Sequence, residues 1–431
     1  MRQGSRRWKT AAVVAGAAIA LAACGSSGPG ESSSESGATA WALTGQEATF
    51  EDSFQRWGDE HPDEGIGLEF FENDAYKQKI RTAVGSGSGP TLIFGWGGGI
   101  LRSYVESDRV APLDNEISKR YFPAVADNGR VDGKTYAVPN NAVQPIVLYY
   151  NQNVLDKADI DGPPQTWDEL LTDVKALNDA GVAPLSIGGQ SKWPQLMWLE
   201  YLTDRIGGPE VFEAILSGEP KAWSHPAVLK ANTMIQDLVD SGGFAEGFAS
   251  ITTDNEADVA LVHTGKAAMI LQGSWAYPNF KEAQPELVAD GTIAATTFPT
   301  VKGGKGDPGA VVGNPANFWS VSADADEDAQ QAAQHYLEKG VLDDEYVQGL
   351  IDGGGVPPVK GLEDEVAKSD DADFLSFVYE LSRDAPTFQL SWDQALTPKQ
   401  ADALLTNLEK VFLQTVTPEE FSTAMNKTIT S

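Results

Sequence analysis

Cysteine is almost absent from this chain. Cys24 is the only cysteine in 431 residues, so no disulfide can form within the chain. A chain of this length without disulfides must rely on a large hydrophobic core, and it is long enough to form two domains. Hydrophobic residues make up 41% of the sequence, which excludes a largely disordered protein.

Basic residues are also scarce. Lys and Arg together number 31 against 62 Asp and Glu, which gives a formal net charge of −31. Nucleic-acid binding requires basic patches, and an acidic surface is repelled by anionic lipid headgroups. We therefore expect no nucleic-acid partner and no direct electrostatic adhesion to a membrane.

Patterns typical of catalysis and metal binding are equally sparse. The four histidines, His61, His225, His263 and His335, lack the close spacing of a zinc site. The sequence contains no Gly-x-Ser-x-Gly elbow, and Gly95-Trp-Gly-Gly-Gly99 lacks the Lys-Ser ending of a phosphate loop. We expect this glycine run to be a strand-to-helix turn whose backbone approaches a ligand. The sequence predicts no catalytic residue, no metal and no cofactor, and hence a protein that is not an enzyme.

The first 23 residues have the layout of a secretory signal peptide, with basic residues before an apolar run from Ala11 to Ala23. The run is shorter than the roughly 20 residues of a membrane span. Leu21-Ala-Ala-Cys24 resembles the lipobox of bacterial lipoproteins, which implies that Cys24 is lipidated and anchors the protein outside the cell membrane. Arg6-Arg7 suggests twin-arginine export, but a strong motif is missing, so ordinary secretion is favoured.

Beyond a flexible tether at residues 24–40, rich in Gly and Ser, order is expected to begin near Trp41. Helix and strand signals then alternate from Phe50 to Glu106, which favours a mostly parallel sheet covered by helices in this part of the chain. The last third of the chain is expected to be mainly helical. Thr166, Thr397 and Thr417 each have a Glu or Gln three residues later, which predicts three capping boxes.

Four tryptophans lie in turn-like settings beside polar residues or glycine: Trp96, Trp193, Trp275 and Trp392. Ligands of open α/β sheets bind at such turns, outside the carboxyl ends of the strands. Flat indole rings also suit the C–H face of a pyranose. Each tryptophan alone is as readily explained by core packing, but four together favour a sugar-binding cleft.

The order of motifs resembles the family 1 extracellular solute-binding proteins of ABC sugar importers, the maltose-binding-protein group. The motifs are Asp132-Gly-Lys-Thr-Tyr-Ala-Val-Pro139, Tyr149-Tyr-Asn151, Pro163-Pro-Gln-Thr-Trp-Asp-Glu-Leu170, Gly265-Lys-Ala-Ala-Met269, Gly273-Ser-Trp275 and Val356-Pro-Pro358. The segment from Asn140 to Trp193 is most similar to actinobacterial oligosaccharide-binding lipoproteins, with a lean toward binders of xylobiose or similar β-linked sugars.

The resemblance implies a two-lobed α/β fold of the periplasmic-binding-protein type, with hinge crossovers and a helical C-terminal region. The N-terminal lobe would comprise residues 41–145 and 317–341, and the C-terminal lobe residues 146–316 and 342–431. The hinge would include Pro145, Gly313 and Asn314.

The resemblance also implies which residues contact the sugar. These are Gln46 or Glu47, Trp96, Asn140, Asn141, Trp193, Trp275, Trp392 and Asp393. One departure from the family pattern is that the asparagine pair stands where a carboxylate is often found.

We therefore expect a monomeric, lipid-anchored receptor that passes an oligosaccharide to ABC permease subunits driven by a separate ATPase. A secreted glycoside hydrolase remains an alternative, and it would need two carboxylates about 5–9.5 Å apart. A binding lipoprotein for a peptide or a cationic osmolyte is a further alternative, because an aromatic cage can hold a quaternary ammonium group.

Overall fold

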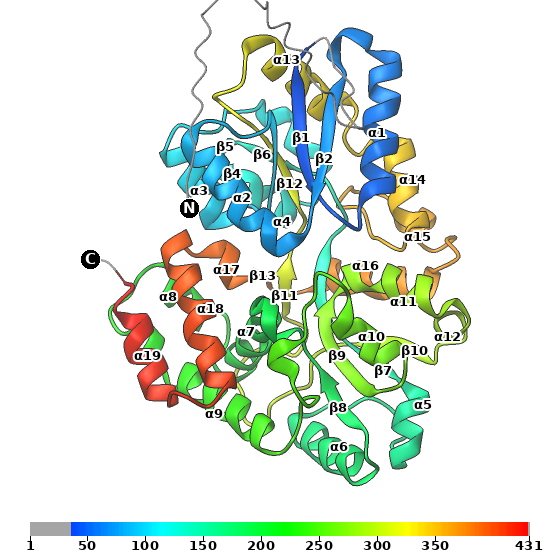
Figure 1. The fold of residues 1–431 in the computed structure, drawn as a ribbon, viewed down its shortest axis with the longest axis vertical. Helices are drawn as coiled ribbons and strands as arrows, with labels where there is room; N and C mark the ends of the chain where they lie inside the picture. The colour runs from blue at the N-terminus through cyan, green and yellow to red at the C-terminus, as the bar shows by residue number, and fades with distance from the viewer. Residues whose placement is uncertain (1–35, 430–431) are drawn as a thin grey trace, which may run out of the picture. The chain divides into compact units, whose positions relative to one another are not determined.

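The computed structural model describes residues 36–429. The predicted signal peptide, the lipidation residue Cys24 and most of the predicted tether lie outside the described residues. The described residues form two α/β lobes, each built around its own sheet (Figure 1). Within this part of the chain, no helix combines the length and the apolar character needed to cross a membrane.

The first lobe is built on a five-stranded sheet in the order β2-β1-β3-β12-β6, with a small ribbon of β4 and β5 beside it. β1 is parallel to β2 and β3, and β12 is antiparallel to both of its neighbours. The strands are β1 (Ala38–Leu43), β2 (Ile66–Phe71), β3 (Leu92–Gly95), β4 (Arg130–Val131), β5 (Lys134–Thr135), β6 (Ala137–Pro139) and β12 (Phe318–Val321). The helices are α1 (Glu47–Glu60), α2 (Asn73–Ser86), α3 (Gly98–Glu106), α4 (Pro123–Ala126), α13 (Glu327–Lys339) and α14 (Asp344–Asp352).

The first strand begins earlier than the sequence predicts. Ala38, Ala40 and Ala42 are fully or almost fully buried, and β1 pairs with β2 from Ala38 onward. These small residues follow a Gly/Ser-rich segment, so their composition suggests a continuation of the tether. Their alternating burial is instead typical of a strand. The tether therefore ends before Ala38 rather than at residue 40.

The second lobe contains a six-stranded sheet in the order β13-β11-β7-β9-β8, with β10 also paired to β7. The strands are β7 (Gln144–Asn151), β8 (Ala183–Ser186), β9 (Ala267–Gly273), β10 (Ile293–Thr296), β11 (Val311–Asn314) and β13 (Phe388–Leu390). β7 runs antiparallel to β9, β10 and β11, so this sheet is mixed. The reason is that β7 enters directly from the other lobe and not through a βαβ crossover.

Helices cover this second sheet and make up most of the C-terminal third, as predicted. They are α5 (Gln152–Leu155), α6 (Trp167–Asp179), α7 (Trp193–Gly207), α8 (Glu210–Leu216), α9 (Pro226–Asp240), α10 (Ala257–His263), α11 (Tyr277–Ala283), α12 (Pro285–Ala289), α15 (Glu363–Val366), α16 (Ala372–Asp384), α17 (Trp392–Ala395), α18 (Pro398–Phe412) and α19 (Pro418–Asn426). The three predicted capping boxes are confirmed at Thr166, Thr397 and Thr417, where the helices begin.

The chain crosses between the lobes in three places. Residues 140–143 join β6 to β7, residues 315–317 join β11 to β12, and a third connection follows α14. The first lobe therefore extends beyond residue 341, where the sequence predicted its end. α14 packs against α1, with the Tyr346 ring 6.3 Å from that of Phe50. The Tyr346 hydroxyl also donates to the Asn140 carbonyl at 2.6 Å.

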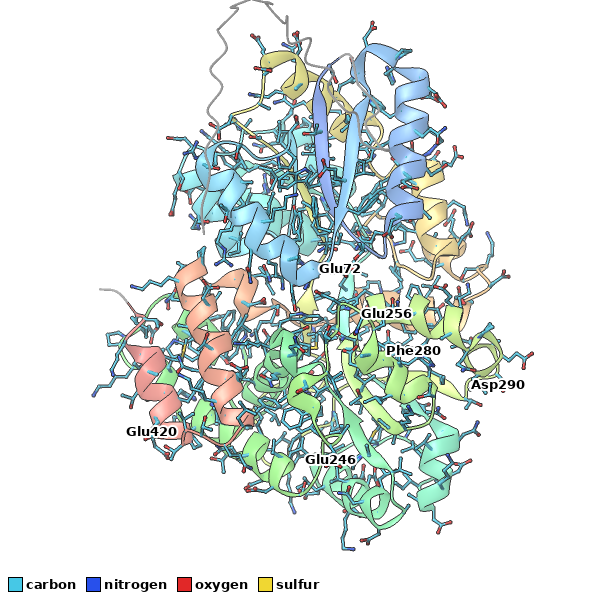
Figure 2. All side chains as sticks on the ribbon, in the orientation of Figure 1. Glu72, Glu246, Glu256, Phe280, Asp290 and Glu420 are labelled. Atoms are coloured by element: carbon cyan, nitrogen blue, oxygen red, sulfur yellow. The ribbon has the colours of Figure 1, made fainter. Side chains whose placement is uncertain are left out.

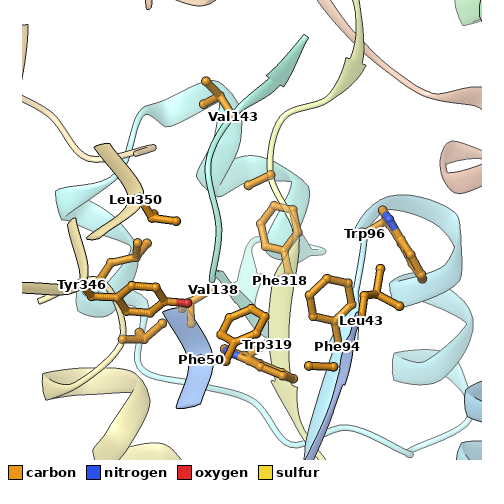
Figure 3. Packing of buried hydrophobic residues seen from close by; sticks show 14 of the residues in the cluster. Leu43, Phe50, Phe94, Trp96, Val138, Val143, Phe318, Trp319, Tyr346 and Leu350 are labelled. Atoms are coloured by element: carbon orange, nitrogen blue, oxygen red, sulfur yellow. The ribbon is translucent and has the colours of Figure 1, made fainter. Parts of the chain in front are cut away.

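Phe50 is the centre of the aromatic core of the first lobe (Figure 3). Its ring lies 6.3 Å from that of Phe94 and 5.4 Å from that of Trp319. These rings come from α1, β3 and β12, so one cluster fixes the helix to the sheet on which the cleft-facing loops are mounted. The second lobe packs part of its core in a separate cluster around α7, α9 and α18, whereas Val147 and Tyr149 of β7 belong to the same cluster as Phe50.

The lobes touch through α2 and α3 of the first lobe and α17 and α18 of the second. The Arg81 guanidinium lies 2.8 Å from the Asp402 carboxylate across this boundary. The glycine run after β3 makes the closest approach. A Cβ atom at Gly99 would lie 2.4 Å from the Leu396 carbonyl oxygen, so only glycine permits the observed contact. The glycines accommodate the backbone of the other lobe, whereas the sequence predicted that they approach a ligand.

We expect Gly99→Ala to separate the lobes without unfolding either one, because the new methyl group would meet backbone atoms of the other lobe. Small-angle X-ray scattering should show an increased radius of gyration with unchanged circular dichroism. The matched control is Gly85→Ala, where a Cβ meets no atom within 4 Å. Scattering curves that coincide for Gly99→Ala and the wild type would contradict this account of the contact.

Candidate functional site

A cleft of about 450 Å³ lies between the two lobes, within the range typical of small-molecule sites. The carboxyl ends of β1, β2 and β3 face it, where ligands of open α/β sheets bind. Its lining includes Gln46, Glu72, Lys77 and Trp96 from the first lobe, Trp193, Asp254, Glu256, Gln272, Trp275 and Asp393 from the second lobe, and Asn141, Gln144, Gly313, Asn314 and Asn317 from the crossovers.

Three of the four predicted tryptophans line the cleft, and they come from both lobes. Trp96 follows β3 and is supported by the Phe94 ring at 5.6 Å. Trp193 begins α7, and its ring lies 6.0 Å from that of Trp275 at an interplanar angle of 53°. The two lobes thus present indole surfaces toward a common space.

Lys77 of α2 reaches between these surfaces. Its ammonium nitrogen lies 5.2 Å from the Trp96 ring centre and 5.6 Å from that of Trp193, within the range of cation–π attraction. It also lies 3.7 Å from the carboxylate of Asp393, whose side chain is 7% exposed. The pair joins the lobes and leaves neither charge uncompensated in the cleft.

Three buried polar atoms at the cleft lack a hydrogen-bond partner among the described residues. They are Oε1 of Gln46, Nε1 of Trp193 and Oδ1 of Asn314. Burying such atoms without partners costs free energy, so in a stable protein they point to an additional bonding partner. Together they offer two acceptors and one donor, as a hydroxyl-rich ligand requires.

Of the two neighbouring asparagines, one lines the cleft and the other is buried behind it. Asn141 lines the cleft, and its amide donates to the Asn317 Oδ1 at 3.5 Å. Asn140 is fully buried beneath it and is absent from the cleft lining. The same Asn317 oxygen accepts from the Gln144 amide at 2.7 Å, so it joins two crossovers. Asn140 therefore lies behind the residues that line the cleft and is not one of them.

The structure distinguishes between the two alternatives at the start of α1 and shows where the predicted hinge residues lie. Glu47 is the first residue of α1 and lies outside the cleft lining, whereas Gln46 belongs to it. Pro145 and Gly313 are paired partners in β7 and β11, and Asn314 pairs with Gln144. The proposed hinge residues therefore lie in paired strands at the edge of the crossovers, and their role in hinge motion stays a prediction.

Trp392 is a core residue and not a cleft residue. Its side chain is fully buried, with its ring stacked on Phe212 at 4.5 Å and 5.8 Å from the ring of Trp223. It begins the short helix α17, whose next residue, Asp393, does face the cleft. The turn-like sequence context therefore marked the correct segment, but it is the neighbouring side chain, that of Asp393, which reaches the cleft.

A buried carboxyl group holds this segment in place. Oε1 of Glu200 accepts from the Trp392 amide at 2.6 Å and from the Ser391 hydroxyl at 3.0 Å. Burial raises the pKa of Glu200 well above its usual value, and the nearby Asp393 charge raises it further. Burial therefore favours the neutral form of Glu200, which anchors α17 through these two hydrogen bonds.

The cleft is acidic. Glu72, Asp254, Glu256 and Asp393 line it, and among the described residues Lys77 is the only lysine or arginine in the lining. Glu72 and Glu256 lie on the two sides of the boundary between the lobes (Figure 2). Desolvation raises the pKa of Asp254 and of Glu256, and neighbouring carboxylates add to both shifts. This excess of negative charge disfavours anionic ligands.

Asp258 supports the floor of the cleft. Its Oδ2 accepts from the Thr253 hydroxyl and the Gln272 amide, each at 3.2 Å, and both donors line the cleft. Burial raises the pKa of Asp258 to about 6. The carboxylate therefore orients two polar groups that a ligand can reach.

Sequence reasoning missed Lys77, Glu72, Asp254, Glu256, Gln272 and Asn317 as cleft residues. These polar residues look like ordinary surface positions in the sequence, and only the approach of the two lobes places them together. The one group of three or more metal-ligating side chains in the described part of the chain lies outside this lining.

The fold and the cleft are those of a two-lobed binding protein. The sequence pattern of the bacterial extracellular solute-binding proteins matches residues 40–341, and the chain belongs to this family.

Among curated relatives, an uncharacterised ABC transporter extracellular-binding protein of Pyrococcus horikoshii is 28% identical over 48% of this chain and 46% of its own length. A probable sugar-binding periplasmic protein of Mesorhizobium japonicum is 26% identical over 60% of each chain. The chain thus spans about half the length of the curated relatives it matches.

Solved structures extend the similarity over nearly the whole chain. One, from work on xylan utilization by Caldanaerobius polysaccharolyticus, has a TM-score of 0.80 and 27% identity, and it covers 91% of this chain and 100% of its own. A chitin oligosaccharide binding protein has a TM-score of 0.81 at 23% identity, covering 91% and 98% of the two chains, and shows the shared fold.

We expect Glu200→Gln to change how stability depends on pH. The raised folded-state pKa means that the stability from Glu200 is fully present below its unfolded value of about 4.5 and is lost as pH rises toward the folded-state pKa. Glutamine removes this loss and keeps the acceptor for Trp392. As the pH rises above about 4.5, the variant should gain stability relative to the wild type in denaturant unfolding.

The control is Glu213→Gln on the exposed face of α8. It should leave the pH dependence unchanged. A stability difference between Glu200→Gln and the wild type that stays constant with pH would show that Glu200 does not carry a raised pKa.

Proposed function

We propose that this protein is a lipid-anchored, extracytoplasmic receptor of an ABC carbohydrate importer. It binds an oligosaccharide, xylobiose or a similar β-linked sugar, between its lobes and delivers it to the permease without chemical change. The observation that carries this proposal is the set of three tryptophans from both lobes beside unpartnered polar atoms. Membership of a family of binding proteins and the similarity to a structure from work on xylan utilization support it.

The mechanism follows from the geometry. Indole faces stack on the apolar faces of the sugar rings, while amides and carboxylates bond the hydroxyl groups. The first lobe contributes Trp96 and Gln46, and the second contributes Trp193 and Trp275. A ligand that contacts both sets stabilises the closed arrangement by as much as it prefers that arrangement. Closure also removes water, which strengthens the polar contacts.

Lys77 and Asp393 make a neutral ligand favourable. Their charges compensate each other across the cleft, so an uncharged sugar leaves neither of these two charges unpaired when the lobes close. The acidic remainder of the lining disfavours uronic acids and other anionic sugars.

A cationic ligand is a second candidate, favoured by the same acidity. The Lys77 ammonium already lies near two indole rings, which shows that their positions suit a positive charge. A quaternary ammonium compound would meet those rings and the carboxylates of Asp254 and Glu256.

The experiment that separates these candidates is a thermal-shift screen of the full chain. The panel includes xylobiose, cellobiose, maltose, chitobiose, betaine and choline. A ligand at about 100 times its Kd stabilises by about 2.7 kcal/mol. A shift with one sugar class supports the proposal and names the sugar, whereas a shift with choline or betaine alone would replace it. Chromatography of the incubated sugar should show no cleavage, and cleavage would point to a hydrolase.

We expect Trp193→Ala and Trp275→Ala to weaken binding of the sugar found in that screen by about 1 kcal/mol or more, roughly a fivefold increase in Kd. Calorimetric titration measures this change. Trp392→Phe is the matched control and should leave the affinity unaltered. Trp392→Ala should instead lower the free energy of unfolding by about 3–5 kcal/mol, because it opens a cavity in the core. Unaltered affinity in both cleft variants would place the sugar elsewhere.

A further inference from the structure

Two histidines and a glutamate meet at a second location, in the first lobe and outside the cleft lining. They are His61, Glu64 and His335, and one ligand atom from each lies within 4.8 Å of the other two. We propose that these three side chains bind a divalent transition-metal ion such as Zn²⁺.

The site joins distant parts of the sequence. His61 follows the last residue of α1, Glu64 ends a short 3₁₀ helix at Pro62–Glu64, and His335 lies in α13. Nδ1 of His335 and Oε2 of Glu64 are 2.7 Å apart although the residues are 271 positions apart in the chain. This separation explains why the spacing of the histidines in the sequence gave no sign of a metal site.

Trp57 holds both imidazole rings in position. The His61 ring lies 3.9 Å from the Trp57 ring with an interplanar angle of 32°, and the His335 ring lies 5.0 Å away at 78°. Trp57 itself is 4% exposed and packs on Tyr336. Rings fixed by packing lose little freedom when they coordinate a metal, so this arrangement is largely preorganised.

The donor set suits zinc and similar ions. Imidazole nitrogen and carboxylate oxygen bind Zn²⁺ at about 2.0–2.2 Å, and three protein ligands leave a fourth position for water. The three donor atoms need to move only modestly to reach such distances. The side chains of His335 and Glu64 are 37% and 34% exposed, so an ion can enter from solvent.

The site is remote from ligand binding. The 3₁₀ helix with Glu64 precedes the amino end of β2, whereas the cleft lies at the carboxyl ends of the strands. A bound ion would tie the end of α1 to α13 and stabilise the first lobe. It should leave sugar affinity unchanged, so this proposal is independent of the proposed function.

The test is calorimetric titration of ZnCl₂ into the full chain in metal-free buffer. A Cys24→Ser background is required because a free thiolate also binds zinc. We expect one ion per chain and a higher melting temperature that EDTA reverses. His61→Ala, His335→Ala and Glu64→Gln should each weaken binding at least about 10-fold. Co²⁺ should give visible absorption bands in the parent chain and lose them in the histidine variants.

Asp63→Asn and His263→Gln are the controls, since both lie outside the three-residue cluster, and both should bind zinc as the parent does. If His335→Ala fails to fold, His335→Gln replaces it. No binding in the parent, or equal binding in both histidine variants, would overturn the proposal and leave the cluster as packing around Trp57.

Discussion

Two hydrophobic clusters determine how this protein is built, and one of them continues from the first lobe into the second. That cluster joins the core of the first lobe to one face of the second sheet, where Val147 and Tyr149 of β7 lie, whereas Ile146 and Leu148 of the same strand belong to the other cluster. The crossing segments are bonded to each other mainly through Asn317. Its side-chain oxygen accepts from the side-chain amide of Gln144, and its carbonyl accepts from the backbone N–H of Asn140. The cleft lies directly against these crossings, so any change in the angle between the lobes changes the distance between the residues that line it.

The electrostatics of the cleft follow from the same division. Lys77 and Asp393 belong to different lobes, and their pairing is possible only while the lobes are close. The carboxylates of Asp254 and Glu256 lie near other acids, which burial and mutual repulsion make easier to protonate. Attraction between Lys77 and Asp393 favours the closed arrangement of the lobes, whereas repulsion among the carboxylates opposes it. A bound ligand can therefore shift the balance between the closed and the open arrangement. A receptor that must open again benefits from such a balance, since an overly stable closed form would hold its ligand.

The buried carboxyl of Glu200 illustrates how a core group can serve the cleft without touching it. It fixes the start of α17 through the backbone of Trp392, and the following residue then points into the cleft. Asp258 plays a similar part for Thr253 and Gln272. In both cases a carboxyl group in a nearly dry environment accepts bonds from groups that would otherwise be free to rotate, which keeps the lining ordered.

Three of the four tryptophans in turn-like settings line the cleft. The sequence by itself determined the local structure, namely the three capping boxes and the helical character of the C-terminal third. These follow from hydrogen bonds and side-chain periodicity within a few residues. Only the tertiary structure decided that Trp392 packs in the core while Asp393 reaches the cleft, that α14 belongs to the first lobe, and that His61 meets His335. Each of these depends on contacts between segments far apart in the chain, whose partners no local pattern specifies.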